Sequence, residues 1–207
     1  MNSLHNYSIR ARVLALLSSI MVMLAAFGPV RADILPFDLL GKAGPGLLPG
    51  NETGTVNGTP GSGGELGSGI LFDNVSLQLT INVGWGSGNG FTDLTGTANS
   101  GHIHQPTPSA PPASFNEATG VLIGLNGLPG YNSSATNGGF NGTVSLTTDQ
   151  ATALTEGRLY LNFHTTTNPG GEIRGNMILV PEPGMTALVA IGGGGLLLLL
   201  RRRLKST

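Results

Sequence analysis

The feature that most constrains the fold of this chain is a strict alternation of apolar and polar residues between positions 74 and 83. The apolar members are Val75, Leu77, Leu79, Ile81 and Val83. Successive side chains of a β-strand point to opposite faces of the sheet. This period of two therefore predicts a half-buried strand, with one face in the core and the other in water.

Further short apolar runs predict strands at residues 100–104, 120–125, 142–147, 157–164 and 172–179. Between these runs lie segments rich in Gly, Pro, Asn and Asp, which are typical of turns. One short helical turn is expected just before the fourth run, at residues 148–156. Several short strands separated by turns predict an all-β fold, either an antiparallel β-sandwich or a barrel.

Composition supports this fold and limits the partners of the domain. The 34 glycines and 13 prolines fall between ordered apolar runs, which favours a turn-rich β protein over a disordered chain. Between residues 33 and 180, three Lys and Arg residues stand against ten Asp and Glu residues. Such an acidic segment repels phosphate backbones, so we expect no nucleic-acid partner. The chain has no cysteine, which excludes disulfides and thiolate metal sites.

The N-terminal residues 1–32 have the three parts of a secretory signal peptide. Basic residues come first, residues 13–27 form an apolar run, and a Gly-Pro pair ends it. Small side chains then mark a cleavage site that we place after Ala32. The alternative is a retained N-terminal membrane anchor. We expect an exported protein with a Gly-, Pro- and Thr-rich lead-in at 33–68, which contains one strand near Leu47, and a β domain at 69–179.

The C-terminal residues 180–207 combine a proline motif, an apolar run at 185–200 and a basic cluster. The motif consists of Pro181, Glu182 and Pro183, and the cluster begins with Arg201, Arg202 and Arg203. A helix over the apolar run would span roughly 24 Å, slightly less than a hydrocarbon core of about 30 Å, and it is predicted to cross the membrane. The arginines are expected to stay in the cytoplasm and stop transfer, which leaves the β domain outside.

In this order, the three parts resemble the PEP-CTERM sorting signal of Gram-negative bacteria. The resemblance implies processing near the Pro-Glu-Pro motif by an exosortase, a membrane transpeptidase-like enzyme, in a system that accompanies exopolysaccharide production. It also implies an inner-membrane-anchored precursor that later reaches the cell surface or extracellular matrix. Extracellular polysaccharide or matrix proteins are then the expected partners. The alternative is an ordinary single-span anchor.

Two segments of the β domain carry a distinctive pattern. Residues 100–105 read Ser-Gly-His-Ile-His-Gln. Residues 160–165 read Tyr-Leu-Asn-Phe-His-Thr, and a Pro-Gly turn then leads to Gly-Glu-Ile-Arg-Gly at 171–175. Together they resemble the CHRD domain over about residues 69–179. The resemblance implies a β-sandwich of the kind found in chordin, a growth-factor antagonist, and in bacterial exported proteins. It transfers no catalytic residues.

Three histidines of this region are candidate metal ligands. His102 and His104 are two positions apart, so they share one face of a strand. His164 lies on the face of its strand opposite the apolar residues. All three are therefore expected to point away from the core and to meet across neighbouring strands. Three imidazoles on a β-surface can hold zinc or copper, with Glu172 or Asp93 as a fourth ligand.

The competing interpretation is that the histidines are structural. His102 and His104 can bond the backbone of the proline-rich segment 106–112, and His164 can cap the turn at 165–168.

Three functional hypotheses follow from the sequence. The leading one is a non-enzymatic surface or matrix protein without a cofactor. The second is a zinc- or copper-binding domain, or a metalloenzyme, that uses the three histidines. The third is a carbohydrate-binding module that uses Trp85 and Tyr131, although a lone tryptophan more often buries its large area in the core.

Overall fold

The computed structural model describes residues 33–50, 55–106, 114–115 and 118–181. The chain divides into two compact units, Met1–Asp33 and Ile34–Thr207, and the elements of the β fold lie in the second. The predicted signal peptide with Ala32, the C-terminal apolar run and the arginine cluster fall outside the described residues. Within the described residues, no helix is long and apolar enough to cross a membrane.

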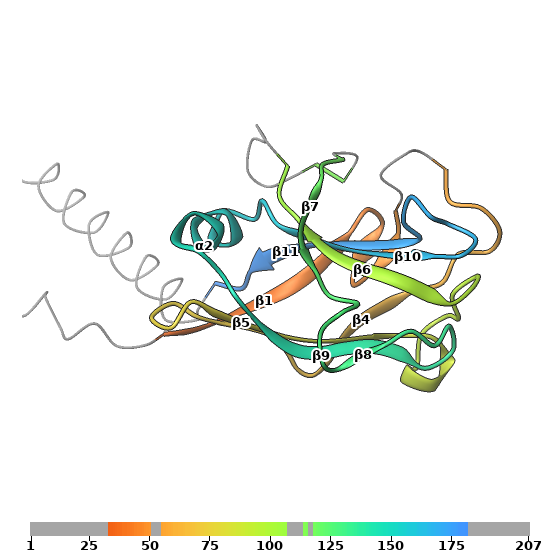
Figure 1. The fold of residues 1–207 in the computed structure, drawn as a ribbon, viewed down its shortest axis with the longest axis horizontal. Helices are drawn as coiled ribbons and strands as arrows, with labels where there is room; N and C mark the ends of the chain where they lie inside the picture. The colour runs from red at the N-terminus through yellow and green to blue at the C-terminus, as the bar shows by residue number, and fades with distance from the viewer. Residues whose placement is uncertain (1–32, 51–54, 107–113, 116–117, 182–207) are drawn as a thin grey trace, which may run out of the picture. The chain divides into compact units, whose positions relative to one another are not determined.

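The described residues form an all-β, antiparallel sheet (Figure 1). In chain order the strands are β1 (Ile34–Gly41), β2 (Gly44–Pro45), β3 (Leu48–Pro49), β4 (Gly63–Asp73), β5 (Gln78–Trp85), β6 (Ala98–His104), β7 (Val121–Gly124), β8 (Tyr131–Asn132), β9 (Gly138–Ser145), β10 (Tyr160–Thr165) and β11 (Ile173–Leu179). In space the order is β7-β6-β10-β11-β1-β4-β5-β9-β8, with β2 beside β1 and β3 beside β11. The strands predicted from the five short apolar runs are confirmed as β6, β7, β9, β10 and β11.

Two short helical segments join the strands. The 3₁₀ helix η1 (Ser87–Asn89) follows β5, and α2 (Thr148–Thr155) follows β9, which confirms the helical turn predicted before β10. A capping box starts α2: the side chain of Thr147 accepts from the backbone N–H of Gln150, and the Gln150 side chain accepts from the backbone N–H of Thr147. Such reciprocal bonds satisfy two of the backbone donors at a helix start.

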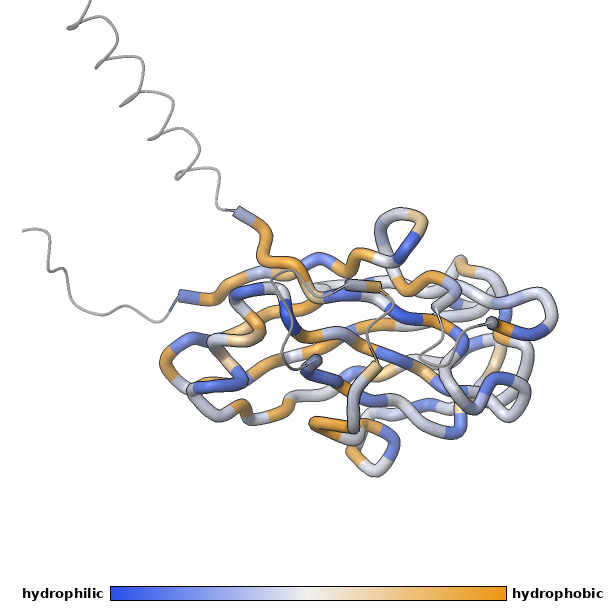
Figure 2. Tube along the Cα trace, turned by 90° about the horizontal axis from the view of Figure 1, so that it is seen from above, coloured by the Kyte–Doolittle hydropathy of each residue, from blue (hydrophilic) through white to orange (hydrophobic). Residues whose placement is uncertain are grey.

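The sheet curls so that strands from its two halves face each other across one core. Trp85 of β5 packs against Phe163 of β10, with 4.6 Å between the ring centroids, although β11, β1 and β4 lie between these strands in the sheet. Tyr131 of β8 reaches β6, where its hydroxyl donates to the carbonyl of Ala98. Figure 2 shows hydrophobic and hydrophilic residues alternating along several strands. The hydrophobic sets meet inside the curl and form the core.

The strand predicted over 74–83 is correct only in its second half. β5 begins at Gln78, and Val75 is 56% exposed in the turn that precedes it. This turn forms because the carboxylate of Asp73 accepts from the backbone N–H groups of Val75 and Ser76. An Asp side chain that bonds the backbone two and three residues ahead stabilises a turn locally, which overrides the alternating pattern.

The interpretation of residues 33–68 as a loose lead-in is wrong, because this segment contains a central strand. β1 lies between β11 and β4, and Phe37 and Leu39 are buried in the core. Pro36 has no N–H group to donate to a neighbouring strand. It lies near the start of β1, where it is paired with β4 but precedes Phe37, the first residue paired with β11. The β domain therefore begins at Ile34.

Candidate functional site

The three histidines lie on two neighbouring antiparallel strands, β6 and β10. In the register of this pair, His102 is opposite Asn162, and His164 is opposite Ser100. On the other face of this pair, Ile103, Leu161 and Phe163 are buried in the core. His102, His104 and His164 therefore share the opposite face of the sheet, as their spacing predicts.

This shared face is covered, which corrects the description of the histidines as surface residues. His104 is 2% exposed and His164 is 7% exposed, whereas His102 is half-buried. All six residues of β10 are buried, so both faces of this strand are packed. The sequence pattern cannot show this cover, because part of it comes from backbone segments that are remote from the histidines along the chain.

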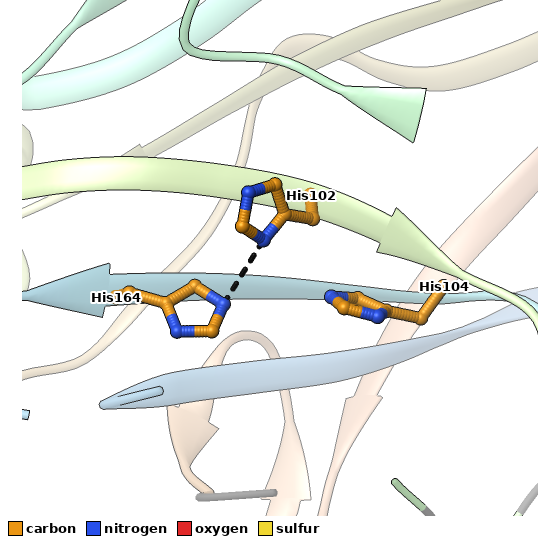
Figure 3. Close-up of side chains that lie close together, drawn as sticks. All are labelled: His102, His104 and His164. Carbon is orange, nitrogen blue, oxygen red and sulfur yellow. Dashed lines mark hydrogen bonds between the residues drawn. The ribbon is translucent and has the colours of Figure 1, made fainter. Parts of the chain in front are cut away.

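The three imidazole rings point toward one another (Figure 3). One ligand nitrogen from each ring lies within 4.8 Å of the other two. The closest contact is 3.1 Å, between Nδ1 of His102 and Nε2 of His164. The ring centroids of His102 lie 5.4 Å from His104 and 4.8 Å from His164. The structure therefore brings together all three predicted histidine ligands.

Backbone carbonyls fix the orientation of two of the rings. Nδ1 of His164 lies 2.9 Å from the carbonyl oxygen of Pro169, and Nδ1 of His104 lies 3.1 Å from that of Thr119. A carbonyl oxygen only accepts, so Nδ1 must carry the hydrogen in both rings. In the neutral form, the lone pair of each ring is then on Nε2. Metal-binding histidines are commonly held by such an outer hydrogen bond.

Aromatic and charged side chains continue the polar layer beside the histidines. The Tyr160 ring stacks on the His104 ring, with 4.8 Å between the centroids and 7° between the planes. The guanidinium carbon of Arg174 lies 3.4 Å from the centroid of the same tyrosine ring. Because β6 and β11 flank β10 on opposite sides, Tyr160 lies between the imidazole and the cation. It keeps the positive charge of Arg174 one ring away from the histidines.

The predicted fourth ligand, Glu172, belongs to a different network. Its side chain is buried, and the group of converging ligand atoms consists of the three histidines without it. The carboxylate accepts hydrogen bonds from five donors, which are the backbone N–H groups of Gly61 and Thr95, the hydroxyls of Thr95 and Thr165, and the side-chain amide of Asn168. Glu172 therefore ties three loops to the end of β10.

These donors decide the charge state of Glu172. Burial alone would raise the pKa of the carboxyl, but the hydrogen bonds from Thr95, Thr165 and Gly61 outweigh burial and hold the pKa below its ordinary value. The carboxylate is therefore ionised in the folded chain. Asp93, the other acidic candidate, is exposed and accepts from the backbone N–H of Ser87.

The two aromatic residues proposed to bind sugar are used for packing. Trp85 is 0% exposed, and its indole N–H donates to the carbonyl of Ser134 at 2.8 Å. Tyr131 is half-buried, and burial raises the pKa of its hydroxyl. A sugar-stacking role for Trp85 is therefore wrong, because its ring faces are covered inside the curl of the sheet.

Several residues of this region were not identified from the sequence. The orienting carbonyls of Thr119 and Pro169 leave no signal in a sequence, because every residue type has a carbonyl. The sequence pattern predicts the strand faces of Tyr160 and Arg174, since Tyr160 is two positions from Asn162 and Arg174 is two positions from Glu172. It does not predict the stacking of Arg174, Tyr160 and His104. The described part of the proposed sorting motif is Pro181, which is exposed; Glu182 and Pro183 lie outside the described residues.

The sequence model of the CHRD domain matches residues 47–177, a range that includes all three histidines and Glu172. No curated protein and no solved structure matches the chain.

Proposed function

This chain belongs to the CHRD domain family, and we propose that its β domain binds one zinc or copper ion in a non-enzymatic, extracellular role. The observation that carries the proposal is the convergence of one nitrogen each from His102, His104 and His164 within 4.8 Å. Neutral imidazole is a common ligand of both metals. The carbonyl bonds to Nδ1 of His104 and His164 support the same function, because they place the lone pair of each neutral ring on Nε2. Nε2 of His164 lies 3.1 Å from Nδ1 of His102 and 3.4 Å from the Asn162 amide nitrogen, and a bound ion would replace these contacts.

The distances are compatible with one ion. Zinc–nitrogen bonds measure about 2.0–2.1 Å, so two ligand nitrogens 3.1 Å apart, as in His102 and His164, subtend an angle of roughly 100° at the ion. Two nitrogens on one ion cannot be more than about 4.2 Å apart at this bond length. The full spread of up to 4.8 Å exceeds this limit, so at least one ring must move toward the other two on binding.

The surroundings of the site favour binding over catalysis. Three protein ligands leave a position for water or an external ligand, as in catalytic zinc sites. Zinc proteases of the His-Glu-x-x-His type also use a nearby glutamate as the general base. Glu172 is engaged by five donors elsewhere, and the converging group contains no carboxylate among the described residues. This arrangement supports a structural or ligand-presenting metal.

The direct test is the metal content of the full-length chain purified without a histidine tag. After treatment with a chelator and then with a slight excess of zinc or copper, we expect one ion per chain to remain after gel filtration, as measured by mass spectrometry of the metals. Asp93→Asn is the matched control, since this exposed carboxylate lies outside the histidine group. A chain that retains no ion of either metal would contradict the proposal.

We also propose that the protein is exported and sorted through its C-terminus by an exosortase-type enzyme. The support is the order of Pro181-Glu182-Pro183, an apolar run and Arg201-Arg202-Arg203. Replacing the three motif residues with alanine should leave unprocessed precursor in the inner membrane. The measurement is an immunoblot of membrane and extracellular fractions, with Val180→Ala as the control. Unchanged sorting of the triple variant would refute this assignment.

A further inference from the structure

A row of uncharged polar pairs covers the outer face of β5 and β9. Gln78 is opposite Ser145 and donates to its hydroxyl at 2.9 Å, and the hydroxyls of Thr80 and Thr143 lie 3.1 Å apart. The third pair of the row is Asn82 and Asn141. Over these three positions the row extends for about 13 Å. The opposite face of the same strands is core, so the row is the solvent side of the sheet.

The row ends in an open groove of about 260 Å³ beside β8 and η1. The groove is lined by an unusual concentration of one residue type, since five of its eleven lining residues are asparagines. These are Asn82, Asn89, Asn132, Asn137 and Asn141. They come from β5, η1, β8, the β8–β9 connection and β9, and no charged residue is among the residues that line the groove.

Two of these asparagines are held in place by the backbone. The side-chain amide of Asn89 donates to the carbonyls of Trp85 and Gly138, both at 2.9 Å, and that of Asn132 donates to the carbonyl of Asn137 at 2.7 Å. These bonds use amide hydrogens, so the Oδ1 atom of Asn89 is directed elsewhere. The walls of the groove are therefore set by the fold before any ligand arrives.

Two glycines that line the groove have no room for a side chain. A Cβ added to Gly139 would come within 2.5 Å of the backbone oxygen of Val83, and one added to Gly138 would come within 2.1 Å of the indole nitrogen of Trp85. Neither position tolerates a side chain without a shift of its neighbours. Both glycines therefore contribute backbone to the groove lining, and Gly138 packs directly against the Trp85 indole.

We propose that this groove and the adjoining polar row bind a neutral oligosaccharide. Asn89 spends its amide hydrogens on the backbone and offers its Oδ1 as an acceptor, whereas the amides of Asn82, Asn137 and Asn141 bring both donors and acceptors to the groove. Sugar hydroxyls both donate and accept, so the two surfaces are complementary. The lack of charged lining residues disfavours ionic ligands, and the acidic domain repels uronic acids. Because the buried rings of Trp85 and Phe140 offer no stacking platform, hydrogen bonds would supply most of the affinity.

The buried tryptophan gives a direct readout, because the sequence contains a single Trp. The full-length chain is titrated with three neutral hexasaccharides, cellohexaose, maltohexaose and mannohexaose, and with the acidic hexagalacturonate. We expect at least one neutral hexasaccharide to change the fluorescence of Trp85 in a saturable way at millimolar or lower concentration. Hexagalacturonate should cause no such change. If no neutral hexasaccharide binds, or if hexagalacturonate binds best, the proposal is overturned.

A double variant locates the binding site. Asn82→Ala with Asn141→Ala removes two amides from the groove and should weaken binding about tenfold, since each neutral hydrogen bond contributes on the order of one factor of ten or less. Asn99→Ala is the control, because Asn99 is exposed on β6 and does not line the groove. Equal affinity of the double variant and the wild type would contradict the assignment. Calorimetry in the presence of a chelator separates this function from metal binding.

Discussion

Replacing His164 with alanine should weaken zinc or copper binding by about 100-fold or more, at least as much as the loss of an outer-shell partner costs in metal sites. His164 makes the closest contact of the group, with its Nε2 atom 3.1 Å from Nδ1 of His102. Its ring is also oriented by the carbonyl of Pro169. The variant therefore removes one of the three ligands and, with it, the close His102–His164 contact. Competition with a chromophoric chelator measures the change.

Ser100→Ala is the matched control for this experiment, because Ser100 lies opposite His164 in the β6–β10 register and is not one of the converging ligands. The thermal unfolding of both variants without metal shows whether the fold is intact. Added zinc should raise the melting temperature of the wild type and of Ser100→Ala but not that of His164→Ala, since a ligand that binds the folded state stabilises it. Equal stabilisation of all three proteins would argue against the site.

Replacing Glu172 with glutamine should lower the free energy of unfolding by about 2–4 kcal/mol. The carboxylate accepts five hydrogen bonds in a buried position, and hydrogen bonds to a charged acceptor contribute about 1.5–3 kcal/mol each before the cost of burying the charge is subtracted. Glutamine also places an amide NH₂ group where donors already converge. Chemical denaturation at pH 7 measures the loss. Glu156→Gln is the control, because it breaks only the exposed ion pair of Glu156 with Arg158, which is expected to contribute less than about 1 kcal/mol.

The same carboxylate predicts the direction of acid denaturation. The pKa of Glu172 is lower in the folded chain than its ordinary value of 4.5, so the unfolded chain binds more protons in the acid range. The stabilisation is complete above pH 4.5 and is lost as the pH falls through the folded pKa. The stability difference between the wild type and Glu172→Gln should therefore shrink below pH 4.5. A difference that stays constant down to pH 2 would contradict this role.

The sequence predicted the parts of the fold that depend on local periodicity. Leu161 and Phe163 alternate with Asn162 and His164, which predicted both β10 and the face on which the histidine lies. β1 was missed because Pro36 argues against a central strand and the apolar–polar alternation there is short. The pairing of β1 with β11 and β4 joins residues that are far apart in the sequence, so no local pattern shows it. In the same way, the two-residue strands β2 and β8 are too short to produce a period, whereas β3 lies where a strand near Leu47 was expected.

For the candidate site, the residue types were predictable and the surroundings were not. The spacing of His102 and His104 placed them on one face, and the strand pattern placed His164 on the matching face. The carbonyls of Thr119 and Pro169, which hold two of the rings, belong to loops that no strand pattern places. Glu172 was misplaced for a related reason, because its five donors come from loops that only the folded sheet brings together.

The most direct test of the metal-binding account is X-ray absorption spectroscopy of the zinc-loaded, full-length chain at the zinc edge. We predict a first shell that contains three imidazole nitrogens at about 2.0–2.1 Å, and a drop to two imidazoles in His164→Ala. A first shell of oxygens alone, or one with the same number of imidazoles in the wild type and the variant, would contradict the assignment of His102, His104 and His164 as a metal site.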